Sequence, residues 1–260
     1  MEVLISHPLA VALGVSLVIN LSMFVVAFRL QSDKLTDISY AVTFATIALW
    51  GLVTSEQSGY HVVLTAMIGL WALRLGGFLL YRVIRSGQDS RFDDMRGDFF
   101  KFGKFWVAQA VTVWVMMIPS VFAYSSTGTP YQPLLAAGVI LWLIGLVCET
   151  IADFQKQAFS RDPKNKNKWV ETGIWRYSRH PNYFGEILVW IGVYVYTLPA
   201  LSSVEPLIAL VSPLFIACLL LFVSGIPILE KSADKRWGTL PAYRAYKKRT
   251  SILIPLPPRD

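Results

Sequence analysis

Seven long apolar runs, separated by short polar segments, dominate the pattern of this chain. Each run is close to the roughly 20 residues that a helix needs to cross a bilayer. The pattern therefore predicts an all-α integral membrane protein built as a bundle of seven transmembrane helices. The predicted spans are 4–28, 38–58, 61–84, 105–124, 132–152, 184–201 and 206–229.

The composition supports this interpretation. The mean hydropathy is +0.49, 54% of the residues are hydrophobic and 16% are charged, which is too apolar for a soluble domain of 260 residues. Residues 1–28 lack a basic leading segment and are long enough to span, so we expect a membrane helix there and not a cleaved signal peptide.

The basic residues predict the orientation of the bundle. With the N-terminus outside, the segments 29–37, 82–104, 152–183 and 230–260 lie on one side and hold every Lys and Arg except Arg74. The positive-inside rule makes that side, and the C-terminus, cytoplasmic. The net charge of +7 then reflects topology and anionic lipid headgroups, and no nucleic-acid partner is expected.

The chain shows no internal repeat and no linker long enough to divide it. We therefore predict a single membrane domain over residues 1–260. Helices 1–4, in residues 1–130, would form the side that meets the substrate, and helices 5–7, in residues 131–260, the side that binds a cofactor.

Polar and charged residues lead into the start of the sixth predicted helix, within residues 175–186. Pro181 stands where a first helical turn begins, and Asn182 and Glu186 lie one turn apart on that helix. A carboxylate inside an apolar helix is costly and usually functional. The free N–H groups at the start of a helix favour anions, so this segment suggests a phosphate-bearing cofactor. Three residues precede the helix and add to this anion site: Arg176, Arg179 and His180.

The end of the fifth helix carries a second polar face. Glu149, Asp153 and Gln157 recur every four residues and could accept hydrogen bonds from ribose hydroxyls or an adenine amine. Lys156 and Arg161 would then be left for phosphate groups.

The cytoplasmic loop at 154–183 and the C-terminal tail leave two interpretations open. The basic loop, with Trp169 and Tyr177, is also typical of a segment that faces lipid headgroups. Tyr243, Tyr246 and Arg249 are spaced by three and predict a short helix, which could contact either a ligand or the membrane interface.

The motif Arg179-His-Pro-Asn-Tyr-Phe-Gly-Glu186, followed by Glu230-Lys, Tyr243-x-x-Tyr246 and a final Ile-Pro, resembles the steroid 5α-reductase-like membrane reductases. The likeness covers about residues 140–260 and is nearest to the bacterial branch. The superfamily also contains sterol carbon-14 reductases and isoprenylcysteine carboxyl methyltransferases, which share the shorter Arg-His-Pro-x-Tyr-x-Gly motif.

This resemblance implies that NADPH is held between the C-terminal helices and the cytoplasmic loops. Asp153, Asn182 and Glu186 would contact the cofactor, and basic residues of the loop and tail its phosphates. The full set of residues predicted to bind the cofactor is Glu149, Asp153, Lys156, Arg161, Trp169, Arg176, Tyr177, Arg179, His180, Asn182, Tyr183, Glu186, Lys231, Arg236, Tyr243, Tyr246 and Arg249.

The resemblance places substrate chemistry in the second and third helices, where the family has a Gln-Glu pair and a Tyr that bind an enone carbonyl. Here the pair is reversed, as Glu56-Gln57, and Arg74 falls near the position of the Tyr, with Tyr81 two turns further on. The predicted catalytic residues are these four. A structural pairing of Arg74 with Glu56 inside the bundle is the alternative.

Three classes of function follow from these patterns. The first is an NADPH-dependent oxidoreductase that reduces a carbon–carbon double bond in a steroid-like or other lipid substrate. The second is a SAM-dependent methyltransferase of the isoprenylcysteine carboxyl type, against which the density of phosphate-suited cations counts. The third is a transporter or structural membrane protein.

The sequence also limits cofactors and location. It has no Gly-x-Gly-x-x-Gly after a strand, so no Rossmann site is predicted, and no cluster with metal spacing, so no metal is predicted. The likeness to the bacterial branch predicts a bacterial inner membrane. Substrate identity, the face of hydride attack and the oligomeric state stay open.

Overall fold

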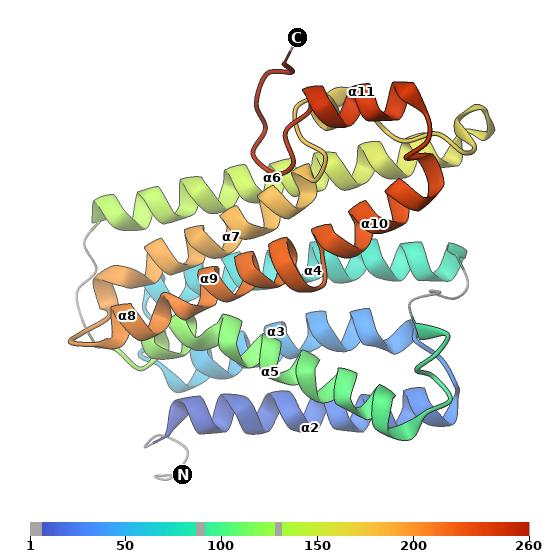
Figure 1. Ribbon diagram of the computed structural model, residues 1–260. Helices are drawn as coiled ribbons and strands as arrows, with labels where there is room; N and C mark the ends of the chain where they lie inside the picture. Colours follow the sequence, from blue (N-terminus) through green and yellow to red (C-terminus); the bar gives the residue numbers. More distant parts are fainter. Residues whose placement is uncertain (1–6, 87–91, 128–131, 260) are drawn as a thin grey trace. The chain divides into compact units, whose positions relative to one another are not determined.

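The computed structural model describes residues 7–86, 92–127 and 132–259, and these residues are mainly helical (Figure 1). Within them, seven segments are long and apolar enough to cross a membrane. The predicted all-α, seven-span fold class is therefore confirmed. In chain order the helices are α2 (Pro8–Arg29), α3 (Lys34–Thr54), α4 (Gly59–Ser86), α5 (Phe99–Tyr124), α6 (Gln132–Arg161), η2 (Pro163–Asn165), η3 (Gly173–Arg176), α7 (Pro181–Thr197), η4 (Leu198–Ala200), α8 (Glu205–Ala209), α9 (Val211–Cys218), η5 (Leu219–Val223), α10 (Ile226–Trp237) and α11 (Pro241–Arg249).

The sequence suggested one continuous helix for the last span, but the structure divides it. It consists of α8, α9, the π-helical turn η5 and α10. The helix breaks at Ser224 and Gly225, and Pro227 stands in the first turn of α10. Proline is tolerated there because a first-turn N–H has no partner within the helix.

The chain forms two compact units. The first comprises Met1–Ala136 together with Val193–Ser212, and in it α2 packs against α3 and α5, and α3 against α4. Its core holds a polar network, in which Gln109 Nε2 donates to Asn20 Oδ1 at 2.9 Å and to Ser39 Oγ at 2.7 Å. Such bonds between helices satisfy polar groups that hydrocarbon would leave unpaired.

The second unit comprises Ala137–Gly192 and Pro213–Asp260, and its framework is a close antiparallel contact between α6 and α7. A β-carbon at Gly192 would lie 2.5 Å from the backbone N of Trp142, and one at Gly185 would lie 2.6 Å from that of Glu149. A β-carbon at Gly145 would lie equally close to α7, 2.6 Å from the backbone N of Val189. Small residues at these positions let the two helix backbones touch, as is common in membranes.

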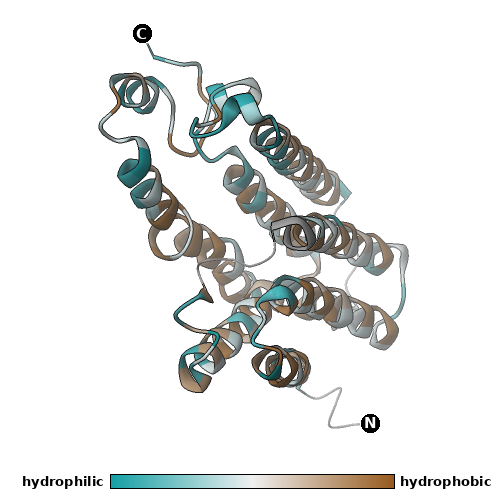
Figure 2. Cartoon of the chain, turned by 90° about the vertical axis from the view of Figure 1, so that its right-hand side faces the viewer, coloured by the Kyte–Doolittle hydropathy of each residue, from teal (hydrophilic) through white to brown (hydrophobic). Residues whose placement is uncertain are grey.

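The hydropathy colours of Figure 2 show apolar residues along the helices and hydrophilic residues at helix ends and in connections. In the first unit, Arg96 Nε lies 3.0 Å from Asp33 Oδ1, which joins two of the predicted cytoplasmic segments. His61 Nε2 lies 3.2 Å from the carbonyl oxygen of Ala123 and joins two helix ends predicted to lie outside. Within this unit the basic segments therefore share one end.

Orientation across the bilayer stays a prediction that reporter tags can check. Tags at residue 260 and within 85–104 should report the cytoplasm, and a tag within 126–129 should report the outside, because the Lys and Arg residues gather at the former ends. Accessibility of a single cysteine or fused reporter in intact cells would measure this. A cytoplasmic signal from 126–129 would contradict the predicted topology.

Candidate functional site

The segment that leads into α7 is held by the last residues of the chain. Pro181 is the first residue of α7, as predicted. Arg179 N donates to Ser251 O at 2.8 Å, and Ser178 Oγ donates to Leu253 O at 2.6 Å. An isolated β-bridge pairs Ser178 with Ser251. The tail, residues 250–259, therefore runs beside this segment and fixes the backbone from which Arg179 and the next residue project.

Glu230, near the middle of α10, gathers three side chains from two other segments. Arg179 Nη1 lies 2.9 Å from Glu230 Oε2, and Lys247 Nζ lies 3.0 Å from the same oxygen. His180 Nε2 lies 2.9 Å from Glu230 Oε1. Lys247 also reaches Asp234 Oδ1 at 2.7 Å. This carboxylate links the start of α7, α10 and α11 into one electrostatic cluster.

The surroundings set the charge of these groups. Burial lowers the pKa of His180, and Glu230 beside it only partly offsets this, so the ring is neutral near pH 7. A carboxylate can only accept, so Nε2 carries the hydrogen toward Glu230. Burial also works against the charged form of Lys247, but hydrogen bonds to Asp234 and Glu230 raise its pKa above the ordinary value. Lys247 is therefore a permanent cation here.

A pocket of about 340 Å³ opens beside this cluster, and we call it the aromatic pocket. Trp169 packs edge-on against Tyr243 with ring centroids 5.1 Å apart, and Tyr246 donates its hydroxyl to Trp175 O at 3.0 Å. Its walls thus combine large rings with cationic side chains. The lining residues are Lys156, Phe159, Ser160, Lys168, Trp169, Val170, Trp175, Arg179, His180, Leu229, Glu230, Ser232, Ala233, Arg236, Trp237, Tyr243 and Tyr246.

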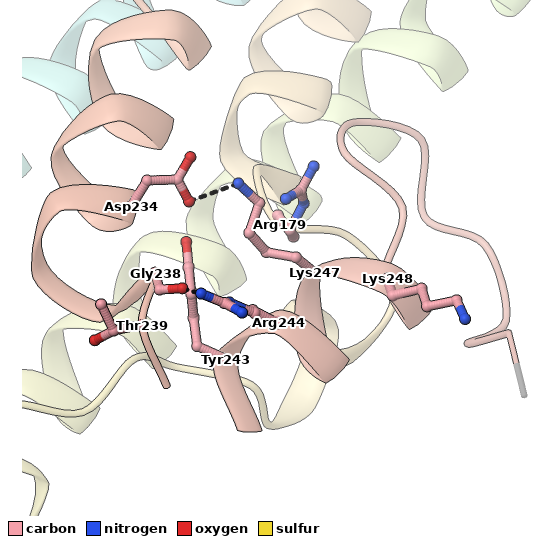
Figure 3. Close-up of a pocket in the computed structure, with 8 residues that line it drawn as sticks. All are labelled: Arg179, Asp234, Gly238, Thr239, Tyr243, Arg244, Lys247 and Lys248. Atoms are coloured by element: carbon pink, nitrogen blue, oxygen red, sulfur yellow. Dashed lines mark hydrogen bonds and ion pairs between the residues drawn. The ribbon is translucent and has the colours of Figure 1, made fainter. Parts of the chain in front are cut away.

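A second, more open depression of about 660 Å³ adjoins it, and we call it the basic hollow. In Figure 3, Lys247 reaches Asp234, and Arg244 turns toward Gly238, whose carbonyl oxygen accepts a bond from Arg244 Nε. Arg179 and Tyr243 line both the hollow and the aromatic pocket. The complete lining is Arg179, Asp234, Gly238, Thr239, Tyr243, Arg244, Lys247 and Lys248.

The acidic residues of α6 lie against the start of α7. Glu149 and Asp153 are both buried, and Glu149 lies opposite Gly185 at the close contact of the two helices. Asn182 and Glu186 flank that glycine on the first turns of α7 and are partly buried. The structure therefore brings the predicted acidic face of α6 and the predicted polar turn of α7 together.

The predicted cofactor residues do not all lie in one place. Seven of them line the aromatic pocket: Lys156, Trp169, Arg179, His180, Arg236, Tyr243 and Tyr246. Tyr183 stacks on His180 with ring centroids 5.7 Å apart. Arg249 instead pairs with Glu171 at 3.0 Å. Three cations and one aromatic residue are exposed and line neither pocket: Arg161, Arg176, Tyr177 and Lys231.

The predicted helix at Tyr243, Tyr246 and Arg249 is confirmed as α11. Both tyrosines are buried inside the protein.

The second unit also brings residues to the site that sequence reasoning missed. Glu230 and Lys247 pair across 17 positions, and Lys168, Trp175 and Trp237 complete the pocket wall. No short spacing signals these partners, although an acid at the end of an apolar run was a detectable cue for Glu230.

The predicted catalytic residues are placed differently from expectation. Glu56 and Gln57 were expected at the end of a buried helix, but α3 ends at Thr54 and both side chains are exposed. Arg74 lies fifteen residues beyond the start of α4, about 22 Å along its axis, so the helix carries it away from the connection that holds Glu56. Arg74 and Tyr81 remain in α4 and are partly buried.

Within the described part of the chain, no group of three or more His, Cys, Asp or Glu side chains could hold a metal ion. The expected absence of a metal stays a prediction.

Residues 23–250 match the family described as "Protein of unknown function (DUF1295)". The chain belongs to this family. DUF1295 is part of the membrane superfamily of steroid 5-alpha-reductases and isoprenylcysteine methyltransferases, which confirms the resemblance at superfamily level. Placement in the bacterial branch stays a prediction.

A fungal protein, "Probable O-methyltransferase ustE" of Ustilaginoidea virens, is 39% identical over 52 residues. That stretch is 20% of this chain and 18% of the fungal protein, so the match spans less than a fifth of the curated relative. No solved structure matches the chain.

Proposed function

We propose that this DUF1295 protein binds NADPH in its second unit and reduces a carbon–carbon double bond conjugated to a carbonyl in a hydrophobic, steroid-like or other lipid substrate. One observation carries the cofactor assignment. Nε of Arg179 is buried and has no hydrogen-bond partner among the described residues, and this guanidinium borders both the aromatic pocket and the basic hollow. A guanidinium donor left open in a cationic pocket suits a phosphate oxygen.

The remaining residues fit a dinucleotide better than a ligand without phosphate. Lys156, Lys168 and Arg236 surround the aromatic pocket, whose rings offer stacking surfaces to a nucleobase. Asn182 and Glu186 at the start of α7 offer hydrogen bonds to ribose or amide groups. With no Rossmann motif in the sequence, helix ends and cations would hold the phosphates.

When bound, NADPH supplies a hydride to the β-carbon of the enone. The chain's task is then to orient the substrate and to stabilise negative charge on its carbonyl oxygen. Glu56 and Gln57 are exposed; Arg74 and Tyr81 carry hydrogen-bond donors within α4, and their part in this role stays a prediction. The apolar helices would admit a lipid substrate directly from the bilayer.

Asn182→Ala and Glu186→Gln should each weaken NADPH binding at least about tenfold, the effect expected for losing one buried or charged hydrogen bond. The dissociation constant measured by NADPH fluorescence on purified protein in detergent checks this. Lys235→Ala, an exposed cation that lines neither pocket, serves as the control. Unchanged affinity in both site variants would remove these residues from the proposed site.

A SAM-dependent methyltransferase is the second candidate, because the short fungal match is to a probable O-methyltransferase. The two proposals differ in the molecule bound by wild-type protein. Mass spectrometry of the ligand that copurifies, with competition binding of NADPH against SAM, would separate them. Saturable SAM binding without NADPH binding would replace the reductase proposal.

A further inference from the structure

The aromatic pocket has two chemically different ends along α10. Leu229 and His180 line it near the apolar start of that helix, whereas Arg236 and Lys168 line it at the other end. Arg236 lies seven positions after Leu229, about 10 Å along the helix axis. The pocket therefore has one end where the neutral His180 ring and the Arg179–Glu230 ion pair lie, and an exposed end that carries Arg236 and Lys168.

The cations of the pocket also differ in how far carboxylates neutralise them. Arg179 pairs with Glu230. Among the residues that the structure describes, no carboxylate lies within ion-pair distance of Arg236 or Lys168, and Arg236 Nη2 instead donates to the neutral side-chain oxygen of Asn167 at 2.7 Å. These two residues therefore keep their full positive charge toward a ligand.

A strained turn holds the cationic end in place. Asn167 has φ +64°, a left-handed conformation that asparagine tolerates better than most residues. Its carbonyl oxygen accepts a hydrogen bond from Trp237 Nε1 at 2.7 Å while its side chain binds Arg236. The Arg236 guanidinium carbon lies 4.9 Å from the Trp237 ring centroid. Arg236 is thus presented beside a ring on which a purine could stack.

We infer that Lys168 and Arg236 bind the 2′-phosphate of the cofactor and make the protein selective for NADPH over NADH. This rests on the proposed function and extends it to the orientation of the cofactor. NADPH and NADH differ only in that phosphate, a dianion for which an arginine is the usual protein partner. The adenosine then lies at the cationic end, and the nicotinamide lies toward Leu229 and the membrane helices.

The test measures binding of NADPH and NADH, with 2′,5′-ADP and 5′-AMP as competitors, to the full chain in detergent. Lys168→Ala and Arg236→Ala should each raise the Kd for NADPH about tenfold, and the double variant about a hundredfold, while the Kd for NADH stays within about twofold. Arg236→Lys should retain part of the preference. Lys168→Ala removes no side-chain hydrogen bond or ion pair among the described residues, so it keeps the test valid if Arg236→Ala reduces folded yield.

The matched control is the double variant Arg244→Ala and Lys248→Ala, which removes the same charge from the neighbouring basic hollow. It should leave the ratio of the two Kd values unchanged. An unchanged ratio in the Lys168 and Arg236 variants would overturn the inference, as would an equal loss of ratio in the control, which would indicate general electrostatic attraction. Wild-type protein that binds neither nucleotide would instead remove the proposed function, and this inference with it.

Discussion

Gly192→Ala should sharply destabilise the protein, although it adds one methyl group. The new β-carbon would lie 2.5 Å from the backbone N of Trp142 and 2.8 Å from Gly138 O, and backbone cannot move aside as a flexible side chain would. Such overpacking typically costs about 1–3 kcal/mol. The midpoint of thermal unfolding in detergent and the yield of monodisperse protein would measure the loss.

Gly69→Ala in α4 is the matched control, because nothing lies within 4 Å of a β-carbon there. Alanine is the better helix former by about 1 kcal/mol, so this change should leave the midpoint unchanged or raise it. Equal midpoints for the two variants would show that α6 and α7 do not require the close contact.

Glu230→Gln should be the most damaging isosteric change at the site. The amide keeps the shape but removes the charge that Arg179 and Lys247 share, and both Glu230 and Arg179 are largely buried, with side chains 17% and 12% exposed. Leaving a buried ion pair without one partner costs about 3–5 kcal/mol, and the lower end applies because some solvent reaches the cluster. A lower unfolding midpoint and faster trypsin cleavage in α11 would report it.

Asp234→Asn provides the comparison for that change, one turn further along α10. Its carboxylate also binds Lys247, but the side chain is 50% exposed, so its loss should cost less than about 1 kcal/mol. Similar shifts in both variants would mean that Glu230 has no special role in joining α7, α10 and α11.

Hydropathy was sufficient to predict the seven spans, because crossing a bilayer demands length and apolarity whatever the packing. It could not predict where helices end. α3 ends at Thr54 and the backbone is already extended at Ser55, so Glu56 lies in a connection although the apolar run seemed to include it. In α6 the helix continues to Arg161, beyond the apolar span that ends at 152 and four residues past Gln157, the last residue of its predicted polar face.

The site was predicted where its signal is local and missed where it is not. Asn182, Glu186 and the cations before Pro181 lie within one short segment, so spacing along a helix indicates their common face. Glu230 and Lys247 meet only because α11 folds back against α10. Trp237 is held at the pocket by its hydrogen bond to the carbonyl oxygen of Asn167. Such contacts depend on the path of the loops, which a single sequence does not reveal.

The contacts of the tail have a consequence for the order in which the protein is made. Ser178 and Arg179 receive backbone and side-chain partners from Ser251 and Leu253, which are synthesised more than 70 residues later. A nascent chain that already holds every membrane helix therefore still lacks the contacts that fix the entrance of α7. Completion of the candidate site must therefore follow synthesis of residues 251–253, so insertion of the helices and completion of this site are separate events.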